Sequence, residues 1–89
     1  MGLHQDVGQF MSISPEQCRA ARALLRLSRH QLAWFADVAE RTIIDFERRA
    51  RSPRQRTLAD LRSELEYAGV VFFDPDEHGG AGVRLTDPL

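Results

Sequence analysis

The stretch SRHQLAWFADVAERTIIDFERRARSP, residues 28–53, joins two short helical patterns to a burst of arginine. Ser28 is suited to cap the first helix, and the second helix spans about residues 39–48, after a break at 37–39. The inward positions are predicted to be Leu32, Phe35 and Ala36 in the first helix, and Ile43, Phe46 and Glu47 in the second. Helices of two turns are marginal by themselves in water, so we expect other elements to bury these positions.

Two further helices flank this stretch. Ser14, Pro15 and Gln17 predict a helix start with a capping box, and helical apolar spacing then continues to about Leu27. The leucines of a later helix, over about residues 55–68, recur at three- and four-residue spacing, and Gly69 is expected to cap its end.

Residues 70–73 and 82–85 are rich in β-formers and are separated by turn-forming residues, which predicts a β-hairpin. The expected architecture is therefore mainly α. It has a flexible lead-in over residues 1–12, a four-helix domain over 13–69, and a β-hairpin with a short tail over 70–89.

The formal charge of −1 hides an asymmetry along the chain of 89 residues. All twelve basic residues are arginine, and ten of them lie in residues 19–56 together with only four acids. The rest of the chain is acidic, so the protein is dipolar, with its positive charge gathered around the stretch quoted above.

The sequence gives little support for a metal site, a catalytic site, secretion or membrane insertion. Cys18 is the single cysteine, which favours a reducing cytoplasm, and we expect its thiol to be buried. The three histidines, His4, His30 and His78, have no metal-ligand spacing with Cys18, so no metal or other cofactor is expected. We find no catalytic motif, no signal peptide and no membrane-spanning run, and therefore expect neither an enzyme nor a membrane partner.

Several of these residues together resemble a known family. Leu32-Ala33, Val38, Thr42-Ile43, Phe46-Glu47, Arg51 and Pro53 look like the pattern of the lambda-repressor-like (XRE-type) helix-turn-helix domain. The resemblance covers about residues 13–69, and the strand segment that follows is of the kind found in small bacterial members of the family.

The resemblance implies roles for individual residues. The helix over about 39–48 would be the recognition helix, with base readout by Glu40, Arg41, Ile44 and Asp45. Contacts to the DNA backbone would come from Arg29, Thr42, Arg48, Arg49, Arg51 and Arg54. Arg22 and Glu47 match an internal ion pair that fixes the recognition helix.

Several positions depart from the family pattern, among them Arg29 in place of a frequent glutamine and the acids Glu40 and Asp45 on the side expected to meet DNA. Asp37 and Arg49 stand where glycine is frequent, so left-handed or strained backbone angles are expected there. Ala39 stands where a capping serine is usual, so the recognition helix should lack a side-chain cap.

The function expected from this pattern is a cytoplasmic, sequence-specific transcriptional regulator, most simply a repressor, that binds double-stranded DNA. It would bind an inverted-repeat operator as a homodimer. Dimerisation is assigned to the hairpin, through Val70, Val71, Phe72, Phe73, Val83 and Leu85.

Alternative interpretations remain open at this stage. The same fold could be a protein-interaction module, an antitoxin or anti-activator, docking on a protein partner through the recognition-helix face and Trp34. Trp34 could equally be an aromatic residue packed on a neighbouring loop. Arg41 could be an exposed arginine paired with Glu40 or Asp45, and residues 48–56 could be a solvated connector.

Overall fold

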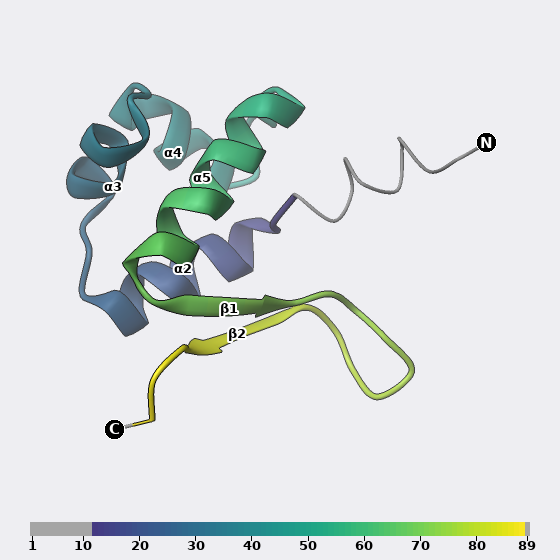
Figure 1. Cartoon of the computed structure of the whole chain (residues 1–89). Coiled ribbons are helices and arrows are strands. Elements are labelled where there is room, and N and C mark those ends of the chain that lie inside the picture. Colours follow the sequence, from purple (N-terminus) through teal and green to yellow (C-terminus); the bar gives the residue numbers. More distant parts are fainter. Residues whose placement is uncertain (1–11, 89) are drawn as a thin grey trace.

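The computed structural model describes residues 12–88, which form four helices followed by a two-stranded antiparallel sheet (Figure 1). The elements are α2 (Pro15–Leu25), α3 (Arg29–Ala36), α4 (Glu40–Glu47), α5 (Gln55–Ala68), β1 (Val70–Phe73) and β2 (Gly82–Leu85). The mainly helical architecture with a C-terminal hairpin is thus confirmed. The predicted flexible lead-in lies, apart from Ser12, outside the described residues.

Two helices begin with the same reciprocal cap. The Ser14 hydroxyl accepts the Gln17 N–H at 3.0 Å, and the Gln17 side-chain oxygen accepts the Ser14 N–H at 2.8 Å. Ser28 and Gln31 repeat this arrangement at the start of α3. Each cap satisfies backbone donors that the first turn of a helix leaves unpaired. Ala39, by contrast, gives α4 no side-chain cap, as predicted.

Three successive helices end in the same way, with a left-handed residue that is not glycine. The φ angles are 58° at Arg26, 56° at Asp37 and 60° at Arg49. In each case the next residue donates its N–H five residues back, in the bonds Leu27 to Arg22, Val38 to Ala33 and Ala50 to Asp45. These are Schellman closures, which usually use glycine because a side chain strains this conformation.

The left-handed angles at Asp37 and Arg49 were predicted, whereas the one at Arg26 was not. It ends α2 at Leu25 instead of Leu27, so the predicted end of that helix was wrong by two residues. Gly69 closes α5 with a φ of 128°, in agreement with its predicted capping role.

The core lies where the four helices and the inner side of the hairpin meet. Its buried apolar residues are Ile13, Cys18, Ala21, Leu32, Ala33, Ala36, Ile43, Phe46, Leu58, Leu61, Leu65, Val70 and Phe72. The prediction that Phe35 points inward was wrong, because the Phe35 side chain is 47% exposed and Ala33 is buried instead. Ala33 is 5% exposed and belongs to the core in which α3 packs against α4 and α5.

The hairpin has the predicted bounds and lies across the helical body from α4 (Figure 1). Val70 pairs with Leu85 and Phe73 with Gly82 in an antiparallel register. The hairpin packs against α2 and α5. The molecule therefore places α4 and the hairpin on opposite sides of a shared helical scaffold.

Candidate nucleic-acid interface

The inner side of α4 is fixed to α2 by a buried ion pair. The Glu47 carboxylate, 2% exposed as a residue, accepts from Nε of Arg22 at 2.7 Å and from its Nη2 at 2.6 Å. This is the internal ion pair that the family resemblance implied. Hydrogen bonding to Glu47 raises the pKa of the Arg22 guanidinium, and Arg22 also donates to the Leu27 carbonyl at 3.1 Å.

Two other arginines join this network. Arg19 donates to the backbone carbonyl of Glu47, and Nη1 of Arg29 lies 3.9 Å from the Glu47 carboxylate. Burial raises the pKa of the Cys18 thiol, and the adjacent Glu47 carboxylate adds to the effect. Cys18 is thus a buried, protonated thiol in this network, and α4 is held in one orientation by three arginines.

The outer side of α4 is open to solvent. Glu40 and Arg41 are exposed, while Thr42, Ile44 and Asp45 are half-buried. Nε of Arg41 lies 3.3 Å from the Asp45 carboxylate one turn along the helix, and Glu40 lies 3.3 Å from Nδ1 of His30. Of the alternatives left open for Arg41, the structure contains the pair with Asp45. Asp45 therefore lies beside a permanent cation, which reduces its repulsion toward a polyanion.

The connection from α4 to α5, residues 48–54, folds back over the last turn of α4. The Asp45 carbonyl accepts N–H groups from Ala50 at 2.8 Å and from Arg51 at 3.3 Å. This return places Arg51 beside the outer side of α4. A hollow of about 120 Å³ lies between them, lined by Arg41, Thr42, Asp45, Arg51 and Pro53.

The arginines of this connection differ in their partners. Within residues 12–88, the side chains of Arg48, Arg51 and Arg54 make no hydrogen bond or ion pair and are exposed. Arg49 instead donates hydrogen bonds from Nε and Nη2 to the Glu16 carboxylate, at 2.7 to 3.1 Å. These hydrogen bonds from Arg49 hold the pKa of Glu16 below its usual value.

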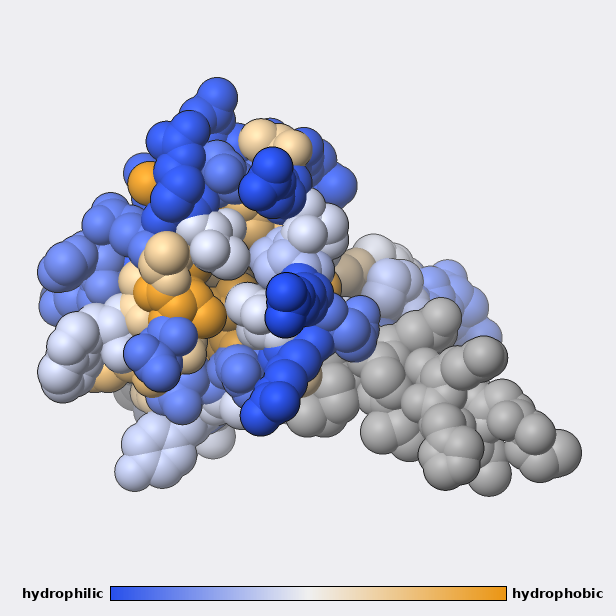
Figure 2. All heavy atoms as spheres, turned by 90° about the horizontal axis from the view of Figure 1, so that it is seen from above, coloured by the Kyte–Doolittle hydropathy of each residue, from blue (hydrophilic) through white to orange (hydrophobic). Residues whose placement is uncertain are grey.

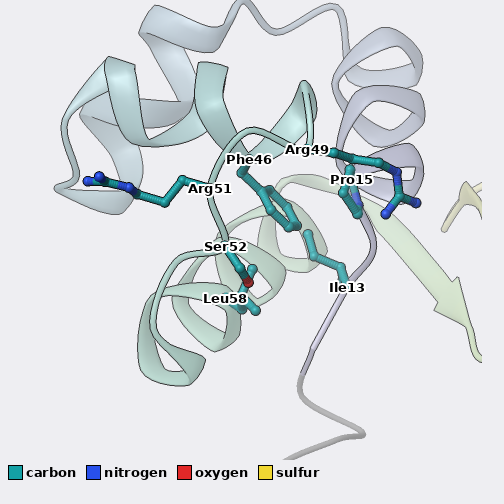
Figure 3. Close-up of a pocket in the computed structure, with 7 residues that line it drawn as sticks. All are labelled: Ile13, Pro15, Phe46, Arg49, Arg51, Ser52 and Leu58. Atoms are coloured by element: carbon teal, nitrogen blue, oxygen red, sulfur yellow. The ribbon is translucent and has the colours of Figure 1, made fainter.

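A larger hollow of about 290 Å³ lies on the other side of the same connection. Its lining is Ile13, Pro15, Phe46, Arg49, Arg51, Ser52 and Leu58 (Figure 3). In Figure 3 Arg49 extends toward Pro15 whereas Arg51 extends in the opposite direction. Both arginines line this hollow, although their side chains extend in opposite directions.

Figure 2 views the molecule from the end that holds α4 and the start of α5. Strongly hydrophilic side chains there surround a small hydrophobic area. Among the exposed side chains of α4 and of the connection that follows it are Arg41, Arg48, Arg51 and Arg54, whose guanidinium groups can bind phosphate oxygens through a rigid planar fork.

The six residues assigned to dimerisation fall into two groups. Val70 and Phe72 are buried in the core of their own chain, and Val83 and Leu85 pack partly against it. Val71 and Phe73 lie on the outer face, where the Arg84 guanidinium sits 4.9 Å from the centre of the Phe73 ring. Only the outer face and the strand edges are thus available to a second copy.

Two contacts were missed by the sequence analysis. The Gln17 amide nitrogen donates to the carbonyls of Phe73 and Gly82, at 3.0 Å each, in addition to its capping role. The Glu16–Arg49 pair was also not foreseen. These partners are 33 to 65 residues apart, so no local spacing could have indicated them.

Within residues 12–88, no cluster of three or more His, Cys, Asp or Glu side chains is arranged to hold a metal ion. No helix in this part of the chain has the length and apolar character needed to cross a bilayer. A scan against protein-family models gave no match, and a search of curated proteins gave none either.

Proposed function

We propose that the chain is a lambda-repressor-like helix-turn-helix protein that acts as a sequence-specific transcriptional regulator, most simply a repressor. In this proposal α3 and α4 form the helix-turn-helix, and α4 enters the major groove of duplex DNA. A homodimer presents two copies of α4 to an inverted-repeat operator, with half-sites about 10 base pairs or a multiple apart.

The observation that carries this proposal is the contrast between the two sides of α4. The inner side is locked to α2 through Glu47, whereas the outer side is open and bordered by exposed arginines. Arg48, Arg51 and Arg54 have no ion-pair partner within the described chain. A rigid helix beside unneutralised guanidinium groups is suited to a groove bordered by phosphates.

The side chains then divide by role. Backbone contacts are assigned to Arg29, Thr42, Arg48, Arg51 and Arg54, with Arg49 joining them where a phosphate displaces Glu16. The outer side of α4 that would face the bases carries Glu40, Arg41, Ile44 and Asp45. Phosphate contacts supply most of the salt-dependent affinity, and base contacts supply the sequence preference.

The test is binding of the chain to random and selected duplex DNA at several salt concentrations. The wild type should bind with a steep salt dependence, and selection should enrich an inverted repeat. Arg51→Ala should weaken binding to all sequences alike and lower the salt slope by about 1. Arg26→Ala is the matched control, because Arg26 is also exposed but lies at the end of α2. Binding without salt dependence, or equal slopes for the two variants, contradicts the proposal.

The homodimer is tested separately by sedimentation. The outer face of the hairpin exposes Phe73, and the strand edges have no partner within residues 12–88. Such edges and apolar faces favour pairing with another chain. Phe73→Glu should shift a concentration-dependent dimer to a monomer, and a wild type that sediments as a monomer at micromolar concentration rules the dimer out.

A protein-interaction module is the second candidate, and one surface favours it. The Trp34 side chain is 77% exposed and stacks edge-to-face on Phe35 with ring centroids 5.6 Å apart. Exposed tryptophan is enriched at binding hot spots. Trp34→Ser should abolish capture of a neighbouring gene product and leave DNA shifts intact if this surface binds a protein. If Trp34→Ser instead loses DNA binding and leaves protein capture unchanged, the regulator is favoured.

A further inference from the structure

We propose that Arg41 and Asp45 act as one guanine-reading unit, in which Asp45 positions Arg41 and does not itself read a base. Arg51, on the other side of the small hollow, holds the adjoining phosphate. This inference rests on the proposed DNA-binding function and names the base that one half-site must contain.

The geometry of the Arg41–Asp45 pair leaves the two outer nitrogens of Arg41 available as hydrogen-bond donors. The Asp45 carboxylate lies 3.3 Å from Nε of Arg41, which is the inner nitrogen of the guanidinium. Nη1 and Nη2 at its outer end donate no hydrogen bond within residues 12–88, and the Arg41 side chain is 72% exposed. Two parallel N–H donors are what the O6 and N7 acceptors of guanine require in the major groove.

Asp45 is poorly placed to read a base itself. Its side chain is only 21% exposed, and its backbone carbonyl is held by the N–H groups of Ala50 and Arg51. Oδ1 of its carboxylate already lies 3.3 Å from Nε of Arg41, so this oxygen is shared with a cation and is a weaker acceptor for cytosine N4. Asp45 therefore restricts the rotamers of Arg41 and lowers the entropy that Arg41 loses when it binds a base.

Arg51 completes the unit. The hollow of about 120 Å³ is bordered by Arg41 and Arg51, with the Thr42 side chain and Pro53 also in its lining. Its volume corresponds to several water molecules at about 30 Å³ each, which is room for a phosphate group. The fold-back of residues 48–54 onto the Asp45 carbonyl sets the distance between the base-reading and phosphate-binding guanidinium groups.

The neighbouring acid does not interfere with this arrangement. Glu40 lies 3.3 Å from His30 on α3, and within residues 12–88 Asp45 is the one acid that pairs with the Arg41 guanidinium. A single acid therefore sets the direction of Arg41. This predicts that guanine recognition depends on the charge of Asp45 although the carboxylate does not touch the base.

The experiment compares operators in which each guanine is replaced in turn by 7-deazaguanine, which lacks the N7 acceptor. For the wild type, replacement at one guanine per half-site should weaken binding about ten- to a hundredfold. Asp45→Asn keeps the shape and removes the charge, and Arg41→Lys keeps the charge and removes the fork. In either variant the 7-deazaguanine replacement should weaken binding only a few-fold, and affinity for random duplex DNA should be retained.

The double variant Arg41→Lys/Asp45→Asn should show no further loss of guanine discrimination, because the two residues act together. Asp37→Asn is the matched control, since asparagine tolerates the left-handed angle found there and should leave discrimination unchanged. Circular dichroism of each variant verifies that the fold is retained.

Two results would overturn the inference while leaving DNA binding intact. Asp45→Asn could keep the full wild-type discrimination, or it could change the preference at a different base pair from Arg41→Lys, which would make Asp45 a reader itself. Absence of salt-dependent duplex binding by the wild type would instead refute the proposed function, and the inference with it.

Discussion

The two parts of the molecule that lie on opposite sides of α2, namely α4 and the hairpin, are attached to it by buried side chains of different chemistry. Glu47 fixes α4 with a full charge against Arg22. Gln17 fixes the hairpin with a neutral amide, which donates to the carbonyls of Phe73 and Gly82 and accepts from the Ser14 N–H. Both anchors are buried, at 2% and 5% exposure.

The difference between the anchors determines how each part can move. A buried carboxylate that loses its cation is an uncompensated charge, so α4 cannot separate from α2 without a large cost. A buried amide loses only hydrogen bonds that water can replace on opening. We therefore expect α4 to open only with global unfolding, and the hairpin to open locally at lower free energy.

Breaking the charged anchor should have the largest effect. Glu47→Gln removes the charge at nearly constant shape and leaves the Arg22 guanidinium, which is mostly buried, without its counter-ion. We expect a loss of about 3–5 kcal/mol in the free energy of unfolding, measured by urea denaturation.

The double variant Arg22→Met/Glu47→Leu provides the control for this prediction. Replacing both charges by apolar groups should recover most of the lost stability, because no unpaired charge remains. If Glu47→Gln costs less than about 1 kcal/mol, the pair behaves as an exposed one and the contrast between the anchors fails.

Breaking the neutral anchor should cost less and act locally. Gln17→Ala removes two hydrogen bonds to the hairpin and one within the cap, for an expected loss of about 1–3 kcal/mol. Amide exchange should accelerate in residues 82–85 more than in α4. Ser14→Ala is the matched control, because it removes only the hydroxyl half of the cap, at about 1 kcal/mol. Equal acceleration in α4 would mean that the hairpin and α4 open together.

The sequence was sufficient for features set by neighbouring residues. The Ser14 cap and the bounds of both strands follow from short motifs, and each was predicted. The left-handed angles at Asp37 and Arg49 were expected from the family resemblance, because glycine is frequent at those two positions. The inward face of α3 was predicted only in part. Leu32 and Ala36 fit a stripe that can include either Ala33 or Phe35, and only the close approach of other helices selects Ala33.

Long-range contacts in the candidate site could not be predicted from local motifs either, because they depend on how the helices pack together. The Glu47–Arg22 pair was expected from a family resemblance, not from spacing, since the two residues lie 25 positions apart. The Glu16–Arg49 pair and the link from Gln17 to the hairpin had no such guide. The local Arg41–Asp45 pair, one helical turn apart, was among the alternatives that the sequence left open.

The Glu16–Arg49 pair is an exposed counterpart of the Glu47–Arg22 anchor and should have the smallest effect of the three. Because Arg49 lowers the pKa of Glu16 in the folded chain, the pair stabilises fully above the ordinary value of 4.5 and is lost as the pH falls through the lower folded value. An NMR titration of the Glu16 side-chain carboxyl should therefore show a midpoint below 4.5.

Arg49→Gly removes this pair and also relieves the left-handed strain at Arg49, so the Glu16 midpoint should return toward its ordinary value while stability at neutral pH is maintained or rises. Arg26→Gly relieves the same strain without touching an ion pair, and should gain about 1 kcal/mol. The difference in stability between the two glycine variants then isolates the contribution of the exposed pair. A Glu16 midpoint unchanged by Arg49→Gly would show that the guanidinium does not set the pKa, and a large stability loss in that variant would make the exposed pair an anchor comparable to Glu47.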